Sequence, residues 1–325
     1  MRNVQIFLFA SLSAAVFVAP APSNAQGPDH AFRDAGPDVQ VAQRGGRQRG
    51  ERKTEEPSEP PPAREPQRPT TLETVVVGAH GRVGVDVLDE TTKCGISRGM
   101  RCDIQQAVGL GLFETGLEPR FPEGADCRGI DEGWAISYTN KRDRENYHGG
   151  IDMPAPFGTP MIAAAAGTVV AKSAEQRSYR GIEIILRHSP EDTGLPVWTY
   201  TQYAHFDEMP SLAVGDRVRM GQALGPTGNS GFQRGGKRAR RPAIHFAVWF
   251  SRSPDWAMVR NVVVPVNGLW MDPVAFYRKA PHFDSAAMKA LPGGEKEVPI
   301  SVMFEDGTTS PAGTKLVWPY TCKKG

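Results

Sequence analysis

Alternating apolar and polar positions predict short β-strands between about residues 146 and 278. The clearest strand covers 243–250. Its side chains alternate between two faces, one carrying Ile244, Phe246, Val248 and Phe250, the other Ala243, His245, Ala247 and Trp249. Further strands are expected at 181–187 and 198–205. Because the gaps are too short for helical crossovers, we expect a mainly β fold with an antiparallel, β-sandwich-like core.

The segments on either side of this core have weaker strand and helix patterns. An amino-terminal extension over 71–145 contains a strand-like run at 74–77 and a short helix over 104–112, and we identify no chemistry in it. A carboxy-terminal extension over 279–325 contains two expected strands, near 298–304 and 315–317.

The first 70 residues are expected to lie outside the folded part. Residues 1–25 have the features of a signal peptide: Arg2, an uncharged apolar run, and the small residues Ser23-Asn24-Ala25. The apolar run is shorter than the ~20 residues that span a bilayer, although an uncleaved anchor is the alternative. Residues 26–70 contain eight prolines and equal numbers of acidic and basic residues, which predicts a disordered linker. We therefore expect a periplasmic or secreted protein with no stable membrane span after cleavage.

Charge and cysteine content further limit the class of protein and the compartment in which it folds. With 38 Lys and Arg against 36 Asp and Glu, the chain lacks the positive surplus of a nucleic-acid-binding protein. Its four cysteines fit an oxidising compartment and two disulfides, with three pairings open. One of these, Cys127–Cys322, would tie the end of the chain to the segment before the core. The spacing of the four cysteines is not that of a structural zinc site.

Four histidines lie in the β-rich part: His148, His188, His205 and His245. His148 and Asp152 are four residues apart, but the glycines between them and the prolines after them disfavour a helix. The glycines instead allow a tight turn that brings imidazole and carboxylate to a common point. One nitrogen and one oxygen suit zinc, although such a pair alone is more often an ordinary hydrogen-bonded turn.

The segments that follow this motif indicate the protein family more strongly than the motif itself. It is followed, in order, by FGTPMIAAAAGTVV at 157–170, YTQYAHF at 200–206, VGDRVRMGQALG at 214–225 and PAIHF at 242–246. In this order and spacing, residues 146–278 resemble the lysostaphin-type (glycyl-glycine endopeptidase) zinc peptidases, which cut peptide cross-bridges in bacterial cell walls. The phrase at 214–222 also occurs in lipoyl and biotinyl carrier domains, but no modifiable lysine stands at the expected place.

The resemblance implies a site. It assigns His148, Asp152 and His245 as zinc ligands, which leaves one position for a water whose pKa the metal lowers to roughly 7. It gives His205 a catalytic role, stabilising the developing oxyanion or moving a proton, and strand parity would place Thr201 and Tyr203 on its side. His188 also matches a frequent family histidine, which we interpret as structural.

One departure from the family pattern bears on activity. The family has an H-x-H motif whose first histidine takes a proton from the attacking water, and Ala243 stands in its place. Loss of a positioned general base costs about 10²–10⁴ in rate. The sequence therefore predicts an exported zinc metalloendopeptidase of reduced activity on peptidoglycan stem or cross-bridge peptides. The alternative is a catalytically impaired zinc-binding module that binds wall peptide or regulates a cell-wall hydrolase such as an amidase.

A second departure is a long basic connection. Residues 232–241 carry five positive charges and no negative one. At the mouth of the expected groove they would attract the free carboxylates of wall peptides, whereas the alternative is a solvated loop.

Overall fold

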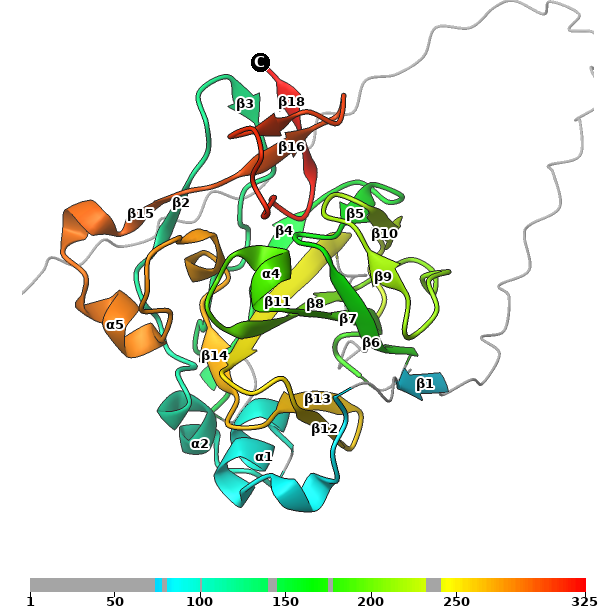
Figure 1. The fold of residues 1–325 in the computed structure, drawn as a ribbon, viewed down its shortest axis with the longest axis vertical. Helices are drawn as coiled ribbons and strands as arrows, with labels where there is room; N and C mark the ends of the chain where they lie inside the picture. Colours follow the sequence, from blue (N-terminus) through cyan, green and yellow to red (C-terminus); the bar gives the residue numbers. More distant parts are fainter. Residues whose placement is uncertain (1–73, 78–80, 100, 140–144, 175–177, 232–240) are drawn as a thin grey trace, which may run out of the picture. The chain divides into compact units, whose positions relative to one another are not determined.

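An antiparallel sheet of eight strands forms the centre of the described part of the chain (Figure 1). Its main path runs through β1 (Thr74–Val77), β6 (Gly167–Ala174), β7 (Ile182–His188), β8 (Trp198–Ala204), β11 (Ala243–Ser251) and β14 (Leu269–Met271). Two further strands join it: β4 (Ile151–Pro154) pairs with β11, and β9 (Arg217–Val218) pairs with β6. The prediction of a mainly β, antiparallel fold is confirmed.

The structure, a computed structural model, describes residues 74–77, 81–99, 101–139, 145–174, 178–231 and 241–325. These residues belong to one compact unit, Gln67–Gly325. The predicted signal peptide at 1–25 and linker at 26–70 lie outside the described residues, as does 232–240 of the basic connection. The predicted domain boundaries at 71, 146 and 279 stay predictions.

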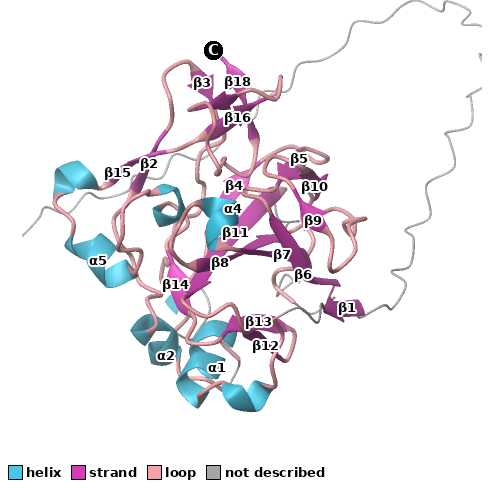
Figure 2. Ribbon diagram, viewed as in Figure 1, coloured by secondary structure: helices cyan, strands magenta, loops and turns pink. Residues whose placement is uncertain are grey.

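Among the described residues, three two-stranded sheets, one four-stranded sheet and short helices lie around the central sheet (Figure 2). The remaining strands are β2 (Glu118–Arg120), β3 (Ala125–Asp126), β5 (Pro160–Ile162), β10 (Ala223–Pro226), β12 (Trp256–Val259), β13 (Val262–Pro265), β15 (Glu297–Pro299), β16 (Val302–Phe304), β17 (Thr309–Ser310) and β18 (Thr321–Lys324). The helices are η1 (Val85–Val87), α1 (Glu90–Ser97), α2 (Ile104–Gly109), α4 (Pro190–Thr193), η2 (Ala275–Tyr277), α5 (Ser285–Ala290) and η3 (Gly293–Glu295). No helix in the part of the chain described is both long enough and apolar enough to cross a membrane.

The carboxy-terminal extension differs from its prediction. The expected strand at 298–304 is two strands, because the chain leaves its parallel partner β2 after Pro299 and then pairs with β17 and β18. Residues 315–317 form no strand. Leu316 and Val317 are buried without forming a strand, and the Val317 N–H donates a hydrogen bond to the Ala164 carbonyl.

Strand β11 is the centre of the core, and all nine of its residues are buried. On one face, Phe246 packs against Tyr203 and Phe276, with ring centroids 5.3 Å and 6.5 Å away. On the other face, Trp249 packs against Trp270 of β14 at 5.3 Å. His245 lies on this second face, at the end of β11 where β4 pairs with it. The sheet therefore fixes the backbone from which His245 projects.

Two disulfides join the four cysteines. Cys127 and Cys322 are bonded across 195 residues, which is the pairing that would tie the end of the chain to the segment before the core. Cys94 and Cys102 close a short loop between α1 and α2. The amino-terminal extension and the carboxyl end are thus covalently joined outside the central sheet.

Candidate metal centre

Asp152 and His245 are direct cross-strand partners on β4 and β11. The Asp152 Oδ1 atom lies 2.9 Å from His245 Nδ1. His148 precedes β4 by a turn through Gly149 and Gly150, and its Nε2 atom lies 3.2 Å from Asp152 Oδ1 and 3.1 Å from His245 Nδ1. The structure therefore brings together the three side chains that the sequence singled out as metal ligands, with their ligand atoms all within 4.8 Å of one another.

Close backbone approach makes this convergence possible. A Cβ atom on Gly150 would lie 2.7 Å from His245 Cε1 and 2.7 Å from the Phe246 carbonyl oxygen. Contacts below 3.0 Å to a packed ring and to backbone are not relieved by small side-chain movements. Gly150 thus lets the turn bearing His148 lie directly against the strand that carries His245.

A backbone carbonyl orients the first imidazole. His148 Nδ1 donates to the Gly133 carbonyl at 3.0 Å, so the lone pair of Nε2 faces Asp152 and His245. Gly133 lies beside Glu132, which exchanges backbone hydrogen bonds with Asp152. The sequence indicated no chemistry in this extension, and a carbonyl contact leaves no side-chain motif by which it could be found.

The three side chains are almost completely buried, with exposed fractions of 7% for His148, 4% for Asp152 and 6% for His245. Burial raises the pKa of the Asp152 carboxyl, but its close contacts with the His148 and His245 imidazoles hold that pKa well below its ordinary range. Two imidazole nitrogens and one carboxylate oxygen thus converge in a buried place that favours a cation.

The donor set and its spacing fit zinc. Tetrahedral zinc with bonds of about 2.0–2.1 Å to nitrogen and oxygen separates neighbouring ligand atoms by roughly 3.3 Å. The three observed separations, 2.9, 3.1 and 3.2 Å, are slightly shorter than this. Three protein ligands also leave a fourth position of a tetrahedral site for water or substrate.

His205 lies beside this cluster but not on the predicted strand. Strand β8 ends at Ala204, and His205 has a left-handed backbone with φ of 71°. Its predicted grouping with Thr201 and Tyr203 by strand parity is therefore wrong, because alternation stops before His205. His205 Nδ1 donates to the Ser230 carbonyl at 2.8 Å, and its ring centroid lies 5.9 Å from that of His245. This hydrogen bond leaves Nε2 as the acceptor nitrogen.

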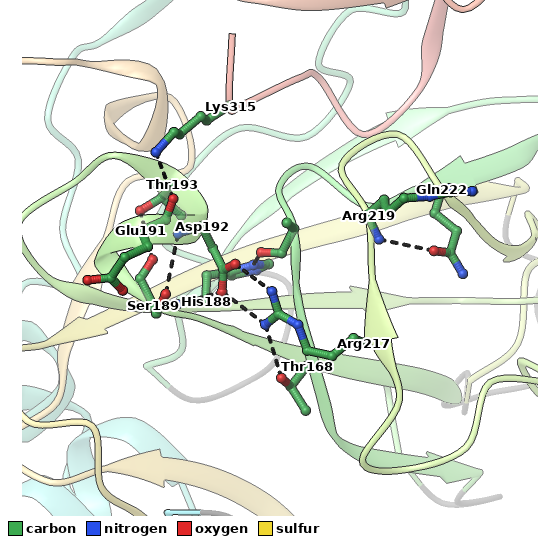
Figure 3. Close-up of polar contacts among 11 residues, drawn as sticks. Thr168, His188, Ser189, Glu191, Asp192, Thr193, Arg217, Arg219, Gln222 and Lys315 are labelled. Carbon is green, nitrogen blue, oxygen red and sulfur yellow. Dashed lines mark hydrogen bonds and ion pairs between the residues drawn. The ribbon is translucent and has the colours of Figure 1, made fainter. Parts of the chain in front are cut away.

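His188 is held by core hydrogen bonds. Its Nδ1 donates to the Ala166 carbonyl at 2.6 Å, and its Nε2 accepts from the Thr201 hydroxyl at 2.7 Å. Complete burial lowers the pKa of His188 to about 4. Figure 3 shows His188 beside the ion pair in which Arg217 Nη2 lies 2.6 Å from Asp192 Oδ1. These contacts support the structural interpretation of His188.

Ala243 begins strand β11 two residues before His245 and therefore projects from the same face. It is buried, and its N–H donates to the Gly228 carbonyl at 3.2 Å. Of the basic connection, only Arg241 is among the described residues; it is exposed and forms an ion pair with Asp131.

Comparison with known proteins places these residues in a family context. Residues 146–255 match peptidase family M23. Over 100 residues the chain is 34% identical to the peptidoglycan DD-endopeptidase ShyC of Vibrio cholerae, covering 30% of this chain and 19% of that one. Over 81 residues it is 37% identical to the uncharacterized lipoprotein YgeR of Escherichia coli, covering 25% and 29%. The chain thus spans less than a third of these relatives.

A solved structure is similar as well. The catalytic domain of lysostaphin from Staphylococcus simulans is 25% identical, with a TM-score of 0.30, covering 39% of this chain and 84% of that one. The family match covers 146–255, whereas the sequence predicts a peptidase-like domain over 146–278.

Proposed function

We propose that this chain, whose residues 146–255 match peptidase family M23, is an exported zinc metalloendopeptidase that acts on the peptide cross-bridges of peptidoglycan. The observation that carries the proposal is the convergence of His148, Asp152 and His245, whose ligand atoms lie within 4.8 Å of one another. Such a set of two imidazoles and one carboxylate is a known arrangement of catalytic zinc.

Each residue of the site has a role in this proposal. His148, Asp152 and His245 would hold the metal, and the Gly133 carbonyl keeps His148 in the tautomer whose Nε2 can bind it. Zinc bound there would supply Lewis acidity toward a peptide carbonyl and activate a water near neutral pH. In this proposal His205 accepts a proton at Nε2, because its Nδ1 donates to the Ser230 carbonyl, and the imidazolium that results stabilises the developing oxyanion.

The proposed substrate rests on the relatives and on the sequence. The relative ShyC is described as a peptidoglycan DD-endopeptidase. The predicted signal peptide and the two disulfides favour the periplasm or the exterior, where wall peptides are present. The five positive charges of 232–241 would attract the carboxylates of stem peptides.

Ala243 favours a second candidate function. It projects from the same face as His245, so a histidine there would face the same site, and alanine has no group that accepts a proton. In this second candidate the domain binds zinc and wall peptide with little hydrolysis, and regulates a cell-wall hydrolase such as an amidase.

Digestion of purified sacculi separates these functions. Wild-type chain and His245→Ala are incubated with sacculi in zinc-containing buffer, and soluble fragments are identified by mass spectrometry. The endopeptidase proposal predicts fragments with new peptide termini from wild type and none from His245→Ala. One zinc per chain and retention on sacculi without cleavage would favour the regulatory module. Absence of zinc after its addition would contradict both.

A further inference from the structure

Arg98 contacts the turn that carries the first of the proposed ligands. Helix α1 ends at Ser97, and Arg98 follows in a left-handed conformation with φ of 51°. Its Nη1 atom donates to the Tyr147 carbonyl at 2.6 Å. Tyr147 immediately precedes His148, so the guanidinium holds the backbone on the amino-terminal side of that ligand.

The same guanidinium also lies against Gly149, the residue that follows His148. A Cβ atom on Gly149 would lie 2.9 Å from both Arg98 Cζ and Trp270 Cη2. The guanidinium also stacks on the Trp270 ring, with Cζ 5.1 Å from the ring centroid. Arg98 and Trp270 therefore form the surface on which the Tyr147–Gly149 backbone rests.

A disulfide closes the segment that carries Arg98. Cys94 and Cys102 are bonded across the loop that contains Arg98. Trp270 Nε1 donates to the Gly95 carbonyl and Trp270 N donates to the Leu110 carbonyl, both at 2.9 Å. These hydrogen bonds attach both sides of the α1–α2 hairpin to β14. The hairpin and β14 both lie outside the family match at 146–255.

We propose that Arg98 is a positioning residue for the metal site, and that the Cys94–Cys102 disulfide holds it in place; this inference rests on the proposed zinc function. Arg98 fixes the Tyr147 carbonyl and the Gly149 backbone, and thereby directs His148 Nε2 toward Asp152 and His245. Residues that orient a metal ligand change metal affinity by about 10–100-fold when they are removed. The amino-terminal extension is therefore part of the metal centre.

The charge of Arg98, considered alone, would weaken zinc binding, whereas its positioning role would strengthen it. A guanidinium repels a divalent cation, so its removal without loss of positioning would strengthen zinc binding. Positioning predicts weaker binding instead. Arg101 offers a matched control, because it carries the same charge in the same disulfide loop and is exposed.

The test is zinc affinity, measured on the full chain by competition with a chromophoric chelator. We expect Arg98→Met to bind zinc about tenfold more weakly than wild type, with Arg101→Met unchanged. Arg98→Lys keeps the charge but not the planar group that rests on Trp270, so it too should bind more weakly. The absorption spectrum of the cobalt-substituted protein should change in the Arg98 variants, because it reports ligand geometry.

Removal of the disulfide tests its part in the proposal. Cys94→Ala/Cys102→Ala should weaken zinc binding, and adding Arg98→Met to it should weaken binding by less than the product of the two effects. Near-UV circular dichroism verifies that each variant folds. If Arg98→Met does not fold, Arg98→Lys replaces it as the test variant. Zinc binding by the Arg98 variants that equals or exceeds wild type would overturn the inference. Failure of wild type to bind zinc would instead overturn the proposed function.

Discussion

Asp152 Oδ1 lies 2.9 Å from His245 Nδ1 because the two residues stand directly opposite each other on β4 and β11. A backbone ladder thus sets the distance between two of the three proposed ligands. His148 reaches them from the turn before β4, where a hydrogen bond to Gly133 orients its ring. The arrangement depends on strand pairing, and we expect the folded chain to have it before metal binds.

Gly150→Ala should disrupt this arrangement. The added Cβ would lie 2.7 Å from His245 Cε1 and from the Phe246 carbonyl oxygen, so backbone or ring must move. Overpacking of this kind costs about 1–3 kcal/mol in the free energy of unfolding, and we also expect weaker zinc binding. Urea denaturation and zinc titration measure both effects. Gly129→Ala is the control, because nothing lies within 4 Å of its added Cβ, and equal behaviour of the two variants would contradict the prediction.

Ala243→His should raise the rate of wall-peptide hydrolysis at least tenfold. The new imidazole would project from the same face as His245 and supply a proton acceptor. The measurement is the initial rate of cleavage of a cross-linked wall peptide at saturating zinc. An unchanged rate would show that loss of this base does not limit hydrolysis.

His188 should make stability depend on pH. Burial lowers its pKa to about 4, from 6.5, so below pH 6.5 the unfolded chain binds a proton that the native chain does not. The free energy of unfolding therefore falls as the pH falls from 6.5 toward 4, by about 3 kcal/mol in all. The raised pKa of buried Asp272, about 6, acts in the opposite direction.

Comparison with His188→Gln isolates the histidine, because Asp272 titrates alike in both proteins. The stability advantage of wild type, measured by urea denaturation, should be largest above pH 6.5 and should shrink toward pH 4.5. An advantage that stays constant over this range would contradict the assigned burial effect.

The two disulfides should contribute unequally to stability. In the chain-entropy description, a bond across 195 residues contributes about 5 kcal/mol and one across eight residues about 2.5 kcal/mol. The free energy of unfolding should thus fall further in Cys127→Ala/Cys322→Ala than in Cys94→Ala/Cys102→Ala. The reverse order would show that the short loop carries more than its closure entropy.

Side-chain pattern predicted the central strand, and the resemblance to the lysostaphin-type peptidases assigned the residues of the candidate site. The alternation over 243–250 corresponds to β11, and His148, Asp152 and His245, the ligands that the resemblance implies, converge in the structure. Sequence patterns report side-chain chemistry and periodicity, and these features depend on both.

Features that depend on main-chain contacts could not be predicted. The Gly133 carbonyl that orients His148 and the Tyr147 carbonyl that Arg98 binds have no side-chain signature. The left-handed backbone of His205 likewise breaks a parity that the sequence alone suggested would continue. The division of 298–304 into β15 and β16 follows from a change of strand partner, which local pattern does not encode.

The most direct test of the metal centre is the zinc content of the purified full chain, measured by inductively coupled plasma mass spectrometry after zinc loading and dialysis. We predict one zinc ion per chain in wild type and close to none in Asp152→Ala/His245→Ala. A wild-type chain that retains no zinc, or a double variant that retains as much as wild type, would contradict the proposed metal centre.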